Sequence, residues 1–132
     1  MTETMVPSIQ VVVVSGLDQA KRLMAGLSMA VAAAAAGTRV RLFLSMDGVQ
    51  CLDRDACHRV LVPGYPPVAE LLGVIRDSGG AVEYCPNCLP SGCDNHVARQ
   101  APSGDAPCGC AGVPAGLASY GVRLSECPTI MV

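Results

Sequence analysis

The stretch IQVVVVSG, residues 9–16, decides the fold. A continuous run of β-branched residues that ends in Ser15-Gly16 is typical of a strand buried on both faces, as in parallel sheets. Asp18 stands where it can cap a helix that runs to about Ala36, and Gly37 provides a stop signal. The start of the chain therefore predicts a strand followed by a helix.

The same alternation continues along the chain. Val40 to Leu44 predicts a second strand, and Ala81 to Cys85 predicts a third. Between them, a short helix over Asp53 to Val60 and a longer one from Pro67 to Ile75 are expected, with Gly79-Gly80 ending the latter. This order favours an α/β fold in which helices cover a parallel sheet.

Beyond the third strand the pattern weakens. Residues 90–112 are rich in Pro, Gly and Cys and predict a long loop. After the loop, Val113 to Tyr120 is expected to form a short helix and Gly121 to Cys127 a fourth strand. The length of 132 residues indicates one domain over residues 1–132.

Right-handed crossovers bring the carboxyl ends of parallel strands to one edge of the sheet. That edge should carry Ser15-Gly16, the turn Met46-Asp47-Gly48, and Cys85-Pro86-Asn87-Cys88. Ligand sites of open α/β sheets lie at this edge, so the topology places Cys85 where chemistry usually occurs.

The composition excludes several classes of protein. Hydrophobic residues make up 51% and charged residues 15%, which excludes a disordered chain. The net charge of −2 argues against nucleic acid or an anionic membrane as a partner. The apolar run 23–36 is shorter than the roughly 18–20 residues that span a bilayer, and Met1 to Thr4 does not resemble a secretion signal. A cytoplasmic protein is expected.

Eight cysteines are the unusual feature of this sequence. In a reducing compartment, clustered thiols indicate metal binding or thiol chemistry. Five of them lie close together in the sequence: Cys85, Cys88, Cys93, Cys108 and Cys110. Cys51, Cys57 and Cys127 are expected to be core or partly buried thiols, and His58 a surface histidine.

The motif Cys85-x-x-Cys88 allows three interpretations: a dithiol redox pair, half of a metal site, or a carrier thiol with a second thiol beside it. Zinc is the metal that the ligand types favour, with Cys85, Cys88, Cys108 and Cys110 as its ligands. No cofactor other than zinc is indicated.

Four features together resemble the DsrE/TusD-type (DsrE/DsrF-like) sulfur-relay family over about residues 8–90. They are Val11 to Gly16, the Ala-rich helix, the segment 40–49 that ends in Met46-Asp47-Gly48-Val49, and Cys85-Pro86-Asn87-Cys88 after the third strand. The resemblance implies a three-layer sandwich on a sheet of four to five parallel strands. It also implies a trimer or hexamer that accepts sulfane sulfur from a donor protein and passes it to an acceptor protein.

In this family the residue that matches Cys85 holds the sulfur as a persulfide, and some branches have a second Cys at the position of Cys88. The interpretation is therefore a sulfur carrier that loads Cys85 and releases through Cys88; a structural zinc domain or a dithiol oxidoreductase are the alternatives. Two departures stand out. Residues 93–112, with Cys93, His96, Cys108 and Cys110, look like an insertion, and the usual last helix and strand are expected to be missing.

Overall fold

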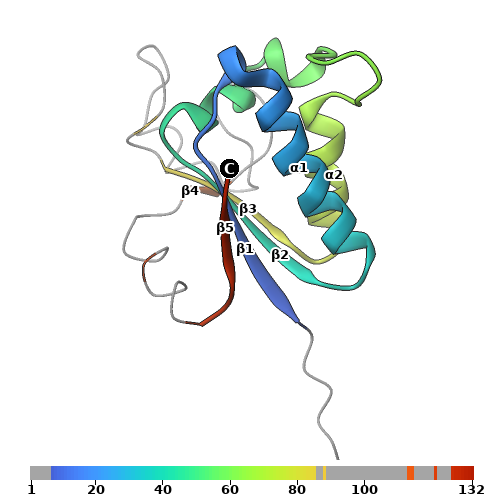
Figure 1. Cartoon of the computed structure of the whole chain (residues 1–132), viewed down its shortest axis with the longest axis vertical. Helices are drawn as coiled ribbons and strands as arrows, with labels where there is room; N and C mark the ends of the chain where they lie inside the picture. The colour runs from blue at the N-terminus through green and yellow to red at the C-terminus, as the bar shows by residue number, and fades with distance from the viewer. Residues whose placement is uncertain (1–6, 86–87, 89–112, 115–120, 122–125) are drawn as a thin grey trace, which may run out of the picture.

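The computed structural model describes residues 7–85, 88, 113–114, 121 and 126–132. Within them, five strands form one sheet in the order β4-β3-β2-β1-β5 (Figure 1). The strands are β1 (Ser8–Val13), β2 (Arg39–Leu44), β3 (Ala81–Tyr84), β4 (Val113–Pro114) and β5 (Thr129–Met131). Every neighbouring pair is parallel, which confirms the predicted α/β fold with its parallel sheet.

Helices α1 (Ala20–Ala35) and α2 (Val68–Asp77) lie side by side on one face of the sheet (Figure 1). The main hydrophobic core lies between these helices and the strands. Its fully buried side chains include Leu23 and Leu27 from α1 and Leu72 and Ile75 from α2. Alternate residues of the strands point into this core, which is why the sheet is lined there by aliphatic residues: Val11, Val13, Val40, Leu42, Leu44 and Val82.

The opposite face of the sheet carries a smaller apolar cluster of Val12, Phe43 and Cys85. Val12 and Phe43 are partners in the β1–β2 register, so their side chains share this face. Cys85 follows β3 directly and joins them. The layer that a three-layer sandwich has on this face lies outside the described residues.

The connections are tighter than the sequence predicted. A single 3-10 turn, η3 (Ala56–His58), replaces the helix expected over Asp53 to Val60. Another 3-10 helix, η2 (Met46–Leu52), begins in the segment that was expected to be only a turn. A third 3-10 turn, η1 (Leu17–Gln19), precedes α1, so the cap predicted for Asp18 is wrong: Gln19 holds the N-cap position and makes no side-chain cap bond. The Gln19 N–H donates to the Gly16 carbonyl at 3.0 Å, and this turn delays the start of α1.

The last part of the chain corrects two predictions. Val113–Pro114 is a strand that pairs with β3, although a helix was expected to begin there. A strand was expected from Gly121 to Cys127, but Gly121 is helical and Glu126 and Cys127 form a turn. The last strand lies at Thr129–Met131 and pairs with β1, so the strand expected to be missing is present. Strands this short show no recognisable alternation of apolar and polar residues. Their position depends on hydrogen bonds to the neighbouring strands.

Across the part of the chain that the structure describes, no helix is both long enough and apolar enough to cross a membrane.

Candidate functional site

The carboxyl ends of β1, β2 and β3 meet at one edge of the sheet, as the topology predicted. Sheet-like hydrogen bonding continues just past the strand ends: the Ser45 N–H donates to the Val13 carbonyl at 3.0 Å, and the Cys85 N–H donates to the Leu44 carbonyl at 2.9 Å. Ser45 and Cys85 are therefore held by backbone bonds on neighbouring strands. This edge is the candidate site.

Cys85 and Cys88 come together through a turn. The Cys88 N–H donates to the Cys85 carbonyl at 3.1 Å, and Cys88 packs against the cluster that contains Cys85. Neither residue forms a disulfide. Cys85 is only 4% exposed and Cys88 is half-buried, so Cys88 is the more accessible of the two thiols.

Ser45 is a member of the site that sequence reasoning missed. Its Oγ lies 4.0 Å from the Cys88 Sγ, within the range of a weak hydrogen bond to sulfur. Ser45 occupies the N-cap position of η2 yet makes no side-chain cap bond, and it is 8% exposed. The only signal in the sequence is a serine directly after the second strand, which also fits a plain turn.

The turn after Ser45 is shaped by close packing. Met46 has a φ of 51°, the left-handed region that non-glycine residues rarely adopt, and its side chain is 64% exposed. Gly48 lies against β1 so closely that a Cβ there would overlap the Val13 carbonyl oxygen. Gly48 is therefore required by packing as well as by the turn, while the Asp47 side chain is exposed.

A neighbouring side chain ties this turn to the loop after β1. The Gln50 Oε1 accepts a hydrogen bond from the Leu17 N–H at 2.9 Å. Gly16 leaves the room that Gln50 needs, since a Cβ at that position would collide with the Gln50 amide. The loops after β1 and β2 are thus fixed to each other beside the thiols.

The remaining described cysteines play different parts. Cys51 is fully buried, and burial raises the pKa of its thiol to about 12, so it is no nucleophile near neutral pH. Cys57 is buried as expected but disulfide-bonded, so the expectation of a thiol is wrong there; that expectation had assumed a reducing compartment. Cys127 forms no disulfide and is half-buried, and His58 is exposed as predicted.

Among the residues that the structure describes, no three His, Cys, Asp or Glu side chains gather as a metal site would require. Two of the four predicted zinc ligands, Cys108 and Cys110, lie outside the described residues, as do Cys93 and His96. The zinc alternative therefore stays a prediction.

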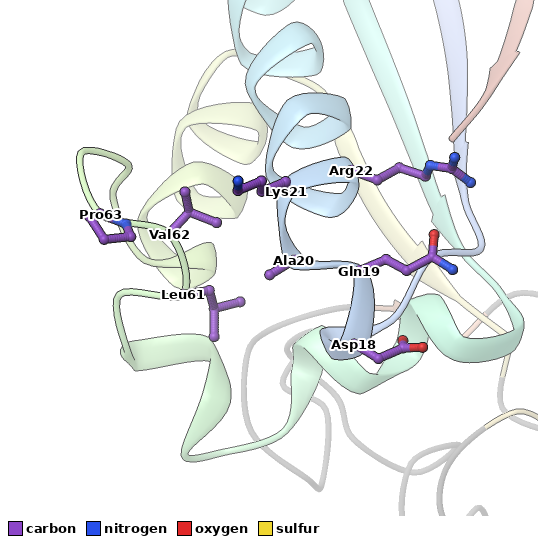
Figure 2. A pocket seen from close by; sticks show the side chains of 8 residues that line it. All are labelled: Asp18, Gln19, Ala20, Lys21, Arg22, Leu61, Val62 and Pro63. Atoms are coloured by element: carbon purple, nitrogen blue, oxygen red, sulfur yellow. The ribbon is translucent and has the colours of Figure 1, made fainter.

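A hollow of about 540 Å³ lies beside the start of α1 and holds no thiol. Its lining residues are Asp18, Gln19, Ala20, Lys21, Arg22, Leu61, Val62 and Pro63. Figure 2 shows that Lys21 extends toward Val62, whereas Arg22 and Gln19 extend to the other side of the helix. Because these polar groups do not converge, this hollow is a weaker candidate than the thiol edge.

Comparison with known proteins agrees with this description. The chain resembles the crystal structure of the ychN protein from E. coli, with a TM-score of 0.68 and 18% identity over 97% of this chain and 100% of that one. At this identity the likeness concerns the fold alone. No curated protein matches the chain. The model of the DsrE/DsrF-like family matches residues 8–91, which is more than half of the sequence and includes both thiols of the candidate site. The chain therefore belongs to the DsrE/DsrF-like family.

Proposed function

We propose that this protein is a sulfur carrier that holds sulfane sulfur as a persulfide on Cys85 and releases it through Cys88. The observation that carries the proposal is the pair of reduced thiols at the carboxyl edge of the sheet, joined by the Cys88 N–H to Cys85 carbonyl bond of 3.1 Å. Membership of the DsrE/DsrF-like family supports sulfur relay as the general role.

Loading begins when the Cys85 thiolate attacks the sulfane sulfur of a donor. The S–S bond of the donor breaks, its remainder leaves with the electron pair as a thiolate, and Cys85 becomes a persulfide. Because Cys85 is only 4% exposed, a donor protein has to present its sulfane sulfur on a group that projects into this edge of the sheet.

Burial among Val12 and Phe43 suits storage. Thiols in solution strip sulfane sulfur by attacking it, and attack requires access. A persulfide on Cys85 is shielded from such thiols, whereas the half-buried Cys88 can be reached by an acceptor.

Release is a second exchange of the same kind. The Cys88 thiolate attacks the outer sulfur, the bond from that sulfur to Cys85 Sγ breaks, and Cys85 leaves as a thiolate. The sulfur then stands on Cys88 as a persulfide, with no net oxidation. An acceptor thiolate removes it from Cys88 by the same reaction. The donor and acceptor are expected to be proteins, and the trimer or hexamer that the resemblance implies stays a prediction.

The test loads the purified full chain with inorganic polysulfide, removes the excess, alkylates the protein and maps its peptides by mass spectrometry. The wild type is expected to carry one extra sulfur on the peptide with Cys85. Cys85→Ser should not load, and Cys88→Ser should load but release more slowly to a thiol acceptor. Cys127→Ser, which removes a reduced thiol outside the pair, is the matched control and should behave like the wild type.

Stoichiometric loading of Cys85→Ser would show that the carrier assignment is wrong. Zinc content measured on the same untreated samples distinguishes the main alternative. If Cys85→Ser, Cys88→Ser, Cys108→Ser and Cys110→Ser each lose one bound zinc and none changes loading, the protein is a zinc-binding domain.

A further inference from the structure

We infer that Ser45 is a positioning residue for the release step: its hydroxyl holds the Cys88 sulfur in place to take sulfur from Cys85. This inference rests on the proposed function and adds to it a residue that neither the sequence motif nor the family match assigns. Three features carry it: the fixed backbone of Ser45, the unused capping capacity of its hydroxyl, and the placement of Cys88.

Ser45 is rigidly held. Its N–H donates to the Val13 carbonyl at 3.0 Å, and its carbonyl accepts from the Gly48 N–H at 2.8 Å. Both backbone groups are thus used, one toward β1 and one within the turn. The side chain is 8% exposed, so its direction is set by packing and not by solvent.

The Ser45 hydroxyl does not cap the 3-10 helix that follows it. A serine at an N-cap position normally accepts a hydrogen bond from an N–H of the first turn. Ser45 stands at that position of η2 and makes no such bond. Its Oγ is instead 4.0 Å from the Cys88 Sγ, its one side-chain partner among the described residues.

A hydrogen-bonding partner adds direction to the placement of Cys88. The backbone bond to the Cys85 carbonyl sets the turn, and the half-buried Cys88 packs against both apolar clusters of the sheet. Apolar contacts are non-directional, whereas a hydrogen bond to the sulfur is directional. Thiol exchange is in-line, so the attacking sulfur must approach along one direction. A hydroxyl hydrogen-bonded to the Cys88 sulfur limits that sulfur to the side of β2.

The experiment measures sulfur release to a small thiol acceptor from chains already loaded on Cys85. Ser45→Ala should load like the wild type and release about 2- to 5-fold more slowly, the lower part of the range that one hydrogen bond supports. Ser45→Thr keeps the hydroxyl and should release at the rate of the wild type. Thermal unfolding of both variants checks that the fold is intact.

A double-mutant comparison assigns the effect to Cys88. In the Cys88→Ser background, Ser45→Ala should add no further slowing, because the partner sulfur is already gone. Equal slowing in both backgrounds, or equal loss in Ser45→Ala and Ser45→Thr, would overturn the inference.

Failure of the inference is separable from failure of the proposed function. If Cys85 loads and Cys88→Ser slows release but Ser45→Ala does not, the carrier stands and Ser45 is only a turn residue. If Cys85→Ser loads as well as the wild type, the carrier assignment fails, and the role given to Ser45 fails with it.

Discussion

Gly48→Ala tests how tightly the site is built onto the sheet. A Cβ at Gly48 would overlap the Val13 carbonyl oxygen, lie 2.8 Å from the Val13 carbonyl carbon and lie 3.3 Å from its Cγ1. Most of these atoms are backbone of β1, an interior strand of the sheet, so no side-chain rotation relieves the collision. The turn after β2 must therefore move away from β1.

The cost follows from what that movement breaks. The Val13 carbonyl accepts the Ser45 N–H at 3.0 Å, and a shifted turn leaves this buried acceptor without its partner, a loss of about 1–3 kcal/mol. Overpacking of a close contact costs a further 1–3 kcal/mol or so. Alanine also lowers the conformational entropy of the unfolded chain, which offsets about 0.4–1 kcal/mol of this loss. The expected net loss of unfolding free energy is roughly 2–4 kcal/mol.

Urea unfolding followed by circular dichroism measures this loss, with Gly73→Ala as the matched control. Gly73 lies inside α2, and a Cβ added there would meet no atom within 4 Å, so alanine should stabilise the chain by about 0.8–1 kcal/mol through helix propensity. Glycine-to-alanine substitution should therefore lower the unfolding free energy at Gly48 and raise it at Gly73. A Gly48→Ala chain within about 0.5 kcal/mol of the wild type would refute the reasoning.

Three further predictions concern other parts of the structure. Met46→Gly should raise the unfolding free energy by about 1 kcal/mol, because glycine tolerates the left-handed φ of 51° and little packing is lost from a side chain 64% exposed; a lower melting temperature would contradict this. Burial raises the pKa of the Cys51 thiol from 9.0 in the unfolded chain to about 12 in the fold. The contribution of Cys51 to stability should therefore be constant below pH 9 and fall by about 1.4 kcal/mol per pH unit between pH 9 and pH 12. Cys51→Ala should lose that part of the slope in alkaline denaturation, and an unchanged slope would show that Cys51 is not its source. Gly26→Ala should lower the unfolding free energy although Gly26 lies in α1, because the added Cβ would lie 2.7 Å from Val132 Cγ1. The Val132 amide, which donates to the Val12 carbonyl at 2.8 Å, should then exchange its hydrogen faster. A gain in stability, as expected for an unhindered helical glycine, would contradict this prediction.

The order and direction of the central elements follow from local patterns in the sequence. The β-branched run at residues 9–14 and the apolar spacing of the two long helices are patterns that tertiary contacts reinforce, so three parallel strands and the common edge of their carboxyl ends could be predicted. The placement of Cys85 at that edge followed from topology alone.

Other features depend on contacts between distant parts of the chain, which no local pattern encodes. The short strands β4 and β5 exist because β3 and β1 offer them hydrogen-bonding partners, which is why Thr129–Met131 could not be recognised beforehand. The contact of Ser45 with Cys88 joins residues 43 positions apart. This contact depends on the registers of β1, β2 and β3. It also depends on the Ser45 hydroxyl, which at an N-cap position would ordinarily bond to a backbone N–H of the turn. The difference between a thiol at 4% exposure and one half-buried arises in the same way, from the packing of strands distant in the sequence.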